Sequence, residues 1–326
     1  MLILSRRDVL DLLTLPDCID AVEAAFRLHA EGRTLGPGVL GVPAEDGGFH
    51  IKAAGLVGER RYFAAKTNAN FPENPRRFGR PAIQGTVVLF DATTGEPLAT
   101  MDSGSVTALR TGAATAVAAK FLARRDARTA TIVGCGVQGA LQVAAIAAVL
   151  PLQRVFVLDT DPERARSLAA RASVSLGISV EARTDLRAAL RESDVCVTCT
   201  PARRAFLAAA DVVPGTFIAA VGADSQGKQE LAPELLASAT LVVDVLEQCA
   251  EIGELQHALA AGLMRREDVH AELADVVAGR RPGRTRDDEV IVFDSSGTAL
   301  QDVAAAIAVY EKARLTGRGT EVKLDD

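Results

Sequence analysis

The fold of this chain is decided by residues 129–161, which read TATIVGCGVQGALQVAAIAAVLPLQRVFVLDTD. A short apolar run, 130–133, meets a glycine turn, and an alanine-rich helical stretch then continues to Pro151. A second apolar run, 155–158, ends on Asp159. This order of strand, glycine turn, helix and acid-terminated strand is the order that a dinucleotide-binding βαβ unit requires.

Each glycine of the turn has its own physical role. Gly134 lets the chain turn tightly, Gly136 has no Cβ to block a pyrophosphate, and Gly139 lets the helix pack closely on the strand. The unpaired N–H groups at the start of the helix favour an anion, because the helix dipole is positive there. A glycine turn without a ligand is the alternative, and the complete βαβ pattern disfavours it.

Asp159 predicts which dinucleotide is bound. It follows Gly139 by 20 residues, the spacing of a carboxylate that accepts hydrogen bonds from the adenosine ribose hydroxyls. A ribose 2′-phosphate would be repelled by Asp159 and Asp161, and no Arg or Lys directly follows Asp159 to receive it. We therefore predict NAD(H) and favour it over NADP(H).

Composition places the chain among soluble globular proteins. Its 326 residues suffice for two domains, and 48% are hydrophobic and 24% charged. A net charge of −6, without a basic tract, predicts no nucleic-acid partner. No uncharged apolar run reaches about 18 residues, and charges come too early for a signal peptide. We predict no membrane association and a cytoplasmic location.

Cysteines and histidines predict no metal site. Cys196 and Cys199 form a CxxC motif, which could be a redox pair or half a metal site. The motif lies in an apolar strand, where positions three apart face opposite sides, so we favour small buried side chains. The four histidines show no metal-binding spacing. The other cysteines are scattered: Cys18, Cys135 and Cys249.

The N-terminal third predicts helices followed by an antiparallel sheet. Residues 1–31 read as two helices, 6–13 and 16–31, and an alanine-rich helix is predicted over 105–124. A loop rich in Pro and Asn, 68–81, separates two of the strands. The strands are predicted at 39–43, 49–54, 62–67, 85–91 and 97–102.

After Asp159 the strand-helix alternation continues and predicts a doubly wound parallel sheet. A helix capped by Asp161 opens this part, and residues 272–289 predict a surface excursion. The last helix is predicted over 296–315, followed by a loose tail. Strands are predicted at 178–182, 194–200, 216–222, 241–245 and 290–293.

Ligands of such sheets bind at the carboxyl ends of the strands. Three polar loops leave predicted strand ends, at 198–201, 221–231 and 294–298. In the second loop Asp224 directly follows a strand and offers a carboxylate for proton transfer. A turn or helix-capping Asp is an equally good interpretation of the bare sequence.

Five segments together carry a specific resemblance: TNANFPENP, GTVVLFDATTGEPLATMDSGSVTALRTGAATAVAAKFLARRD, TIVGCGVQG, VGADSQGKQEL and FDSSGTALQDVAAA. In this order, over nearly the whole chain, they resemble the ornithine cyclodeaminase/mu-crystallin family. The family includes ornithine and lysine cyclodeaminases, alanine dehydrogenases and ketimine reductases. Its members are typically homodimers joined through the domain that does not bind the nucleotide.

The resemblance implies roles for individual residues. Lys66 matches the lysine at the substrate carboxylate and imine, and Arg110 the arginine that contacts the carboxylate. Asp224 matches the acid that binds a side-chain amine and acts as base in cyclodeaminases. Lys66 and Arg110 could instead be surface charges, but their apolar context favours an anionic ligand. The implied cofactor contacts are Gly134, Gly136, Val137, Gln138, Gly139, Asp159, Thr200, Val221, Lys228 and Thr86.

One departure from the family pattern concerns the substrate carboxylate. Many relatives have an arginine where this chain has Gly38. On the following strand His50 and Lys52 share a face. We hypothesise that this face points into the substrate cavity, and that Lys52, with His50, replaces the missing arginine. An exposed face on an edge strand is the equal alternative.

The sequence thus predicts an α/β enzyme with a Rossmann domain, 123–295, that binds NAD(H). Residues 1–122, with 296–326 returning to them, form a predicted α+β domain for substrate binding and dimerisation. The predicted reaction transfers a hydride at the Cα–N bond of a small amino acid or cyclic imine through an iminium. Cyclodeaminase, dehydrogenase and imine reductase remain open, as does a non-catalytic binding protein on the same scaffold.

Overall fold

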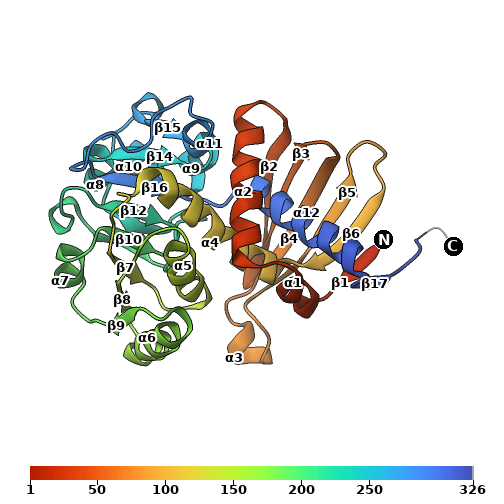
Figure 1. The fold of residues 1–326 in the computed structure, drawn as a ribbon, viewed down its shortest axis with the longest axis horizontal. Helices are drawn as coiled ribbons and strands as arrows, with labels where there is room; N and C mark the ends of the chain where they lie inside the picture. The colour runs from red at the N-terminus through yellow and green to blue at the C-terminus, as the bar shows by residue number, and fades with distance from the viewer. Residues whose placement is uncertain (325–326) are drawn as a thin grey trace. The chain divides into compact units, whose positions relative to one another are not determined.

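The computed structural model describes residues 1–324 and divides the chain into two units. Unit 1 consists of Met1–Ala113 and Thr298–Asp326, and unit 2 of Ala114–Gly297. Helix α4 (Ser103–Leu122) begins in unit 1 and ends in unit 2. Each unit has its own large sheet with helices packed against it (Figure 1).

The large sheet of unit 1 has seven strands in the order β17-β1-β6-β5-β4-β3-β2. Strands β2 to β6 form the predicted antiparallel meander, but β1 pairs parallel with β6, so the sheet is mixed. Strand β1, which precedes the two predicted helices, was not predicted, because it is too short to show an alternating pattern. The strands are β1 (Leu2–Leu4), β2 (Thr34–Ala44), β3 (Gly47–Val57), β4 (Arg61–Asn70), β5 (Ile83–Asp91), β6 (Pro97–Asp102) and β17 (Thr320–Glu321).

Helices α2 (Leu15–Ala30) and α12 (Ala299–Thr316) lie side by side, and α12 packs on β3 and β4 (Figure 1). Thr14 caps α2 by accepting a hydrogen bond from the Asp17 N–H at 3.3 Å. Helix α1 (Arg6–Leu12) precedes α2. The loop prediction for 68–81 was incomplete, because β4 extends to Asn70 and a short helix, α3 (Asn74–Phe78), forms within it.

The predicted loose tail is tied down over its described part. Strand β17 pairs antiparallel with β1, and the Met1 ammonium donates a hydrogen bond to the Val322 carbonyl at 3.0 Å. The last two residues of the tail lie outside the described range. Within residues 1–324, no helix is both long and apolar enough to cross a membrane.

Unit 2 contains an eight-stranded sheet in the order β15-β14-β16-β12-β10-β7-β8-β9, and every strand pair in it is parallel. The predicted doubly wound parallel sheet is confirmed. Its strands are β7 (Thr129–Val133), β8 (Arg154–Leu158), β9 (Ser179–Ala182), β10 (Val195–Thr198), β12 (Phe217–Ala220), β14 (Thr240–Val243), β15 (Ala271–Glu272) and β16 (Ile291–Asp294).

The connections between these strands are mostly helical, and two short strands outside the main sheet form a small parallel sheet, β11-β13. The predicted surface excursion at 272–289 includes a largely buried helix, α11, because its apolar residues pack inward. The connecting elements are α5 (Val137–Ala147), α6 (Pro162–Leu176), α7 (Leu186–Arg191), β11 (Arg203–Leu207), η1 (Ala209–Asp211), β13 (Gln229–Leu231), α8 (Pro233–Ser238), α9 (Leu246–Ile252), α10 (Leu255–Ala260), η2 (Arg266–Asp268) and α11 (Leu273–Val277).

The glycine turn has the conformation that its sequence requires. Gly134 adopts a φ of 105°, which L side chains rarely tolerate. A Cβ on Gly139 would lie 2.0 Å from the Gly134 carbonyl oxygen, so only glycine permits this approach of helix to strand. A Cβ on Gly136 would meet no atom within 4 Å, so the space beside the turn is open.

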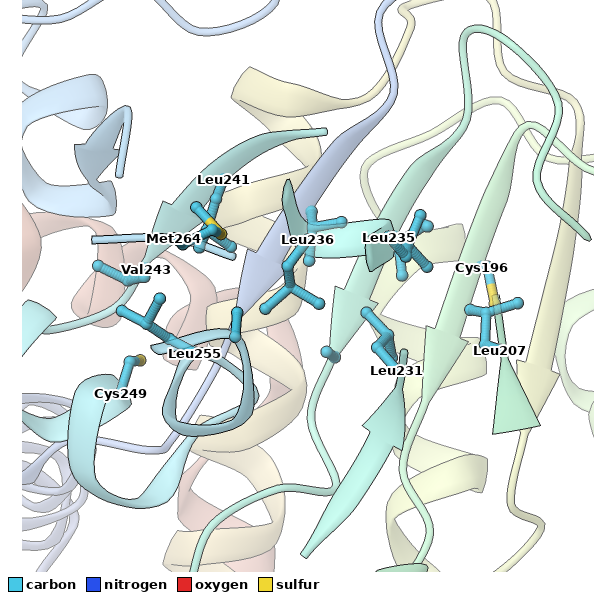
Figure 2. Close-up of a cluster of buried hydrophobic side chains, with 14 of the residues drawn as sticks. Cys196, Leu207, Leu231, Leu235, Leu236, Leu241, Val243, Cys249, Leu255 and Met264 are labelled. Carbon is cyan, nitrogen blue, oxygen red and sulfur yellow. The ribbon is translucent and has the colours of Figure 1, made fainter. Parts of the chain in front are cut away.

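An apolar core of unit 2 includes Cys196, which is fully buried and lies beside Leu207 (Figure 2). Strand β10 ends at Thr198, earlier than predicted, so Cys199 lies beyond the strand and its thiol donates to the Val133 and Gly134 carbonyls. Both are free thiols. The interpretation as a small buried side chain is confirmed for Cys196, whereas Cys199 is only partly buried.

Candidate functional site

Three cationic side chains are buried together in unit 1. Lys66 on β4 pairs in register with Lys52 on β3, which places both side chains on one face of the sheet. Arg110 extends from α4 and shares a carboxylate with Lys66. Their exposed fractions are 9% for Lys52, 3% for Lys66 and 5% for Arg110. Burying three cations is costly, so strong interactions must compensate.

The shared carboxylate belongs to Asp302, in the first turn of α12. Its Oδ2 lies 2.7 Å from Lys66 Nζ, and its Oδ1 accepts a hydrogen bond from Arg110 Nε at 3.0 Å. Arg110 Nη1 also donates to Gln301 Oε1 at 2.7 Å, and Lys66 Nζ to Thr107 Oγ1 at 3.3 Å. We name Lys52, Lys66, Arg110 and Asp302 the cation cluster.

The sequence reasoning missed Asp302. An external anion was predicted as the partner of Lys66 and Arg110, whereas in the structure both side chains pair with Asp302. A signal was present, because Asp302 is an acid within an apolar, alanine-rich helix, and an Asp buried by such a helix requires a partner.

The buried charges of the cation cluster shift one another's pKa values. Burial lowers the pKa of Lys66 to about 7, and Arg110 and Lys52 add to this effect while Asp302 opposes it. Burial alone would raise the pKa of Asp302, but Lys66 and Arg110 hold it below its usual range. Asp302 is one carboxylate shared by Lys66 and Arg110, so a second anion would be bound favourably beside them.

The other predicted substrate residues of unit 1 have different environments. His50 is exposed on β3, two residues from the buried Lys52, so only Lys52 belongs to the cluster. The edge-strand interpretation was wrong for Lys52, because β3 lies between β2 and β4. Gly38 lies on β2, opposite Ala53 of β3. Thr86, a predicted cofactor residue, is exposed on β5. A role for His50 or Thr86 remains a prediction.

In unit 2, Asp159 follows β8 and fastens the glycine turn. Its Oδ2 accepts a hydrogen bond from Cys135 N at 2.7 Å, and its Oδ1 from Asp161 N at 2.9 Å. Burial opposes ionisation, but these N–H groups keep the pKa of Asp159 below its usual value. The carboxylate therefore stays negative and retains lone pairs for ribose hydroxyls.

The glycine turn fits a bound dinucleotide. Gln138 Oε1 is buried and finds no hydrogen-bond partner among the described residues. The open space beside Gly136 and the exposed side chain of Val137 lie at the same helix start. A polar ligand at this turn would satisfy the Gln138 carbonyl and the N–H groups of α5. The turn of Gly134, Gly136 and Gly139 is thus suited to hold NAD(H).

The remaining predicted residues follow β10 and β12 of unit 2. Asp224 Oδ1 and Lys228 Nζ form an ion pair at 2.6 Å, with 55% and 23% of their side chains exposed. The Thr200 hydroxyl donates to Glu230 Oε1 at 2.7 Å, and Val221 is buried. In the part of the chain that the structure describes, no group of three acidic, histidine or cysteine side chains is arranged to hold a metal ion.

Solved structures similar to this chain include three oxidoreductases. An archaeal alanine dehydrogenase, described as a dimer with bound NAD, has 38% identity, covers 99% of both chains and has a TM-score of 0.95. The Δ1-pyrroline-2-carboxylate reductase of Thermococcus litoralis, in complex with NADH and L-proline, has 34% identity, covers 99% of this chain and 100% of that one, and has a TM-score of 0.94.

The third is the iminosuccinate reductase of Paracoccus denitrificans in complex with NAD+, with 36% identity, 99% coverage of both chains and a TM-score of 0.93. These relatives confirm the predictions of an enzyme and of a nicotinamide cofactor at the level of the family. Residues 1–317 match the ornithine cyclodeaminase/mu-crystallin family, which is the family that the motifs predicted. The chain therefore belongs to the ornithine cyclodeaminase/mu-crystallin family.

Proposed function

We propose that this protein is an NAD(H)-dependent amino-acid dehydrogenase or imine reductase that acts on a small α-amino acid or its imine. The observation that carries this proposal is the cation cluster, in which buried Lys66 and Arg110 share one internal carboxylate and Lys52 is buried beside Lys66. An amino acid or its imine supplies the second carboxylate that such a cluster favours. Unit 1 would bind this carboxylate, and unit 2 would bind the dinucleotide.

NAD(H), when bound, supplies the hydride chemistry at the substrate Cα. Lys52, Lys66 and Arg110 would bind the carboxylate and fix the orientation of Cα. In the oxidative direction the resulting iminium is hydrolysed to a 2-oxo acid and ammonia. Lys66, with a pKa near 7, and Asp224 are the groups able to hold or release the required protons.

A cyclodeaminase is the second candidate, and the environment of Asp224 disfavours it. In that reaction a side-chain amine of the substrate attacks the iminium, and Asp224 would bind that amine. Here Asp224 already pairs with Lys228 at 2.6 Å, so the substrate amine would have to compete with a neighbouring lysine. A pure binding protein is a third candidate, but a dinucleotide carrier needs no buried cation cluster.

We also propose that the protein is a homodimer joined through unit 1. Strands β2 and β3 expose large apolar side chains, with exposed fractions between 40% and 56%. Such a patch marks a protein interface, and the archaeal alanine dehydrogenase is described as a dimer. The exposed apolar residues are Leu35, Val39, Leu40, Val42 and Phe49. Light scattering tests this, since a monomer mass at micromolar concentration contradicts it.

The activity is tested by incubating the protein with NAD+ and a panel of amino acids, and with NADH and the matching imines or 2-oxo acids plus ammonium. NADH accumulation with an amino acid, or NADH oxidation with an imine, supports the proposal. Ammonia release without net NADH shows a cyclodeaminase. NADH binding with none of these reactions supports the binding protein.

A further inference from the structure

A buried carboxylate, Glu230, joins three parts of unit 2 at the carboxyl ends of its strands. Glu230 lies on β13 and is 0% exposed. Its Oε1 accepts hydrogen bonds from Thr200 N and Thr200 Oγ1, both at 2.7 Å. Its Oε2 accepts from Thr198 Oγ1 at 2.7 Å and from Gly222 N at 2.8 Å. One side chain thus connects the end of β10 to the segment that follows β12.

The Glu230 carboxylate packs closely against the backbone of Gly222. A Cβ on Gly222 would lie 2.4 Å from Glu230 Cδ, 2.4 Å from the Thr200 carbonyl oxygen and 2.5 Å from Glu230 Oε1. Position 222 therefore requires glycine because both the carboxylate and the Thr200 carbonyl pack on its backbone. Burial raises the pKa of Glu230, whereas the bonds from Thr200, Thr198 and Gly222 act in the opposite direction.

The Gly222–Glu230 hydrogen bond also closes a loop. Residues 222–230 begin and end at this bond, and Asp224 and Lys228 lie between them. The same carboxylate contacts Thr200, a predicted cofactor residue. Glu230 itself touches none of the predicted reacting groups.

A second buried acid, Glu254, holds the backbone of Glu230, and a third, Asp294, holds Glu254 in turn. Glu254 Oε1 accepts a hydrogen bond from Glu230 N at 2.7 Å, and Oε2 from Leu231 N at 3.2 Å. Asp294, at the end of β16, accepts from Glu254 N at 3.0 Å and from Leu255 N at 2.9 Å. Leu231 and Leu255 also belong to the apolar core beneath this region (Figure 2).

We propose that Glu230 is a positioning residue that holds the 222–230 loop, with Asp224 and Lys228, in register with Thr200 at the cofactor-binding edge of unit 2. This proposal rests on the proposed function, because it assigns that edge to NAD(H). Glu230 binds the loop, Glu254 binds the backbone of Glu230, and Asp294 on β16 binds the backbone of Glu254. These contacts connect the loop to a strand of the parallel sheet, which restricts its movement.

Glu230→Gln separates positioning from simple packing, because it keeps the side chain's shape. Each oxygen of Glu230 accepts from one hydroxyl and one backbone N–H. The amide nitrogen of Gln cannot accept, so in either orientation the N–H of Thr200 or of Gly222 loses its acceptor. Gly222→Ala disturbs the same contacts by a different route, because its Cβ would clash with both the Glu230 carboxylate and the Thr200 carbonyl.

Asp194→Asn is the matched control. Asp194 lies just before β10, at the opposite end of that strand, and accepts hydrogen bonds from Arg128 N at 2.7 Å and Thr129 N at 3.0 Å. Like Glu230, it is a carboxylate that joins the ends of strands in unit 2. It lies at the amino ends of β7 and β10, whereas the glycine turn and the 222–230 loop follow the carboxyl ends of their strands. Both Asn and Gln variants are expected to lower the unfolding temperature.

The test measures amide hydrogen exchange, NADH affinity by fluorescence, and the separate kcat and KM of wild type and variants. Glu230→Gln and Gly222→Ala are expected to speed exchange in 198–202 and 221–231 and to reduce kcat/KM by roughly 10- to 100-fold. Asp194→Asn is expected to leave both properties within about twofold of wild type.

Two results overturn the positioning role. One is unchanged exchange in 198–202 and 221–231 when Glu230 is replaced. The other is faster exchange with NADH affinity and kcat/KM equal to those of Asp194→Asn. If wild type neither binds NADH nor turns over, the proposed function fails instead, and the exchange data alone then decide whether Glu230 holds the loop.

Discussion

Replacing Asp302 by Asn is expected to destabilise the protein strongly while preserving the shape of the side chain. The substitution removes the negative charge that lies 2.7 Å from Lys66 Nζ and 3.0 Å from Arg110 Nε. Removing one partner of a buried ion pair typically costs about 3–5 kcal/mol, because the other charge stays buried without compensation. A domain is stable by only about 5–15 kcal/mol, so the expected loss is a large share of the total.

The charge balance makes two further results specific to this explanation. Because Asp302 raises the pKa of Lys66, its removal should lower that pKa below about 7. The cluster then has no internal anion, so a non-reactive carboxylate such as acetate should stabilise Asp302→Asn more than wild type. Replacing both Asp302 and Lys66, by Asn and Met, should destabilise less than the two single changes combined.

Urea unfolding of the wild type, both single variants and the double variant, with and without acetate, measures these effects. We expect a coupling free energy of about 1–3 kcal/mol between the two positions. Strictly additive single changes, together with equal acetate effects on all four proteins, would refute the view that Asp302 balances the buried cations.

Three more predictions follow from the same geometry. Burial lowers the pKa of Lys66 to about 7, so its charged fraction should decline as pH rises above 7, and kcat/KM for a carboxylate substrate should decline with it. The Lys66→Arg variant stays charged and should lose this decline. If the decline remains in Lys66→Arg, deprotonation of Lys66 is not its cause. Burial raises the pKa of Glu254 from 4.5 to about 9, so its contribution to the free energy of unfolding is full below 4.5 and is lost as pH rises towards 9. Glu254→Gln should therefore unfold with a weaker pH dependence than wild type, and parallel curves would disprove this origin. Asp159→Asn removes the charge that accepts hydrogen bonds from Cys135 N and Asp161 N. The affinity for NADH, measured by fluorescence, should therefore fall about 10-fold or more, and the affinity for NADPH should fall less. An unchanged preference for NADH over NADPH would show that Asp159 does not bind the adenosine ribose.

Local sequence signals were sufficient for the centre of the parallel sheet. Gly134 is required by its positive φ, and Gly139 by the close approach of the helix backbone to the Gly134 carbonyl. Both constraints arise within the βαβ segment itself. Asp161 as the helix cap is confirmed for the same reason, since its carboxylate accepts from Glu163 N two residues away.

The missed features depend on residues that are far apart in the chain. Asp302 and Arg110 are separated by 192 positions, and only the packing of α12 in unit 1 brings them together. Strand β1 has three residues, and its structure comes from pairing with β6 and β17 rather than from its own pattern. Such pairings are set by tertiary packing, which local periodicity does not encode.

Recognition of the substrate carboxylate by the cation cluster can be measured directly. The measurement compares kcat/KM for the best amino-acid substrate with that for its carboxamide, in wild type and in an Arg110→Met/Asp302→Asn double variant that removes both charges of one pair. We expect wild type to prefer the carboxylate by roughly 100-fold or more, and the double variant to lose most of this preference. Equal preference for the carboxylate in both proteins would contradict the assignment of the cation cluster as the substrate carboxylate site.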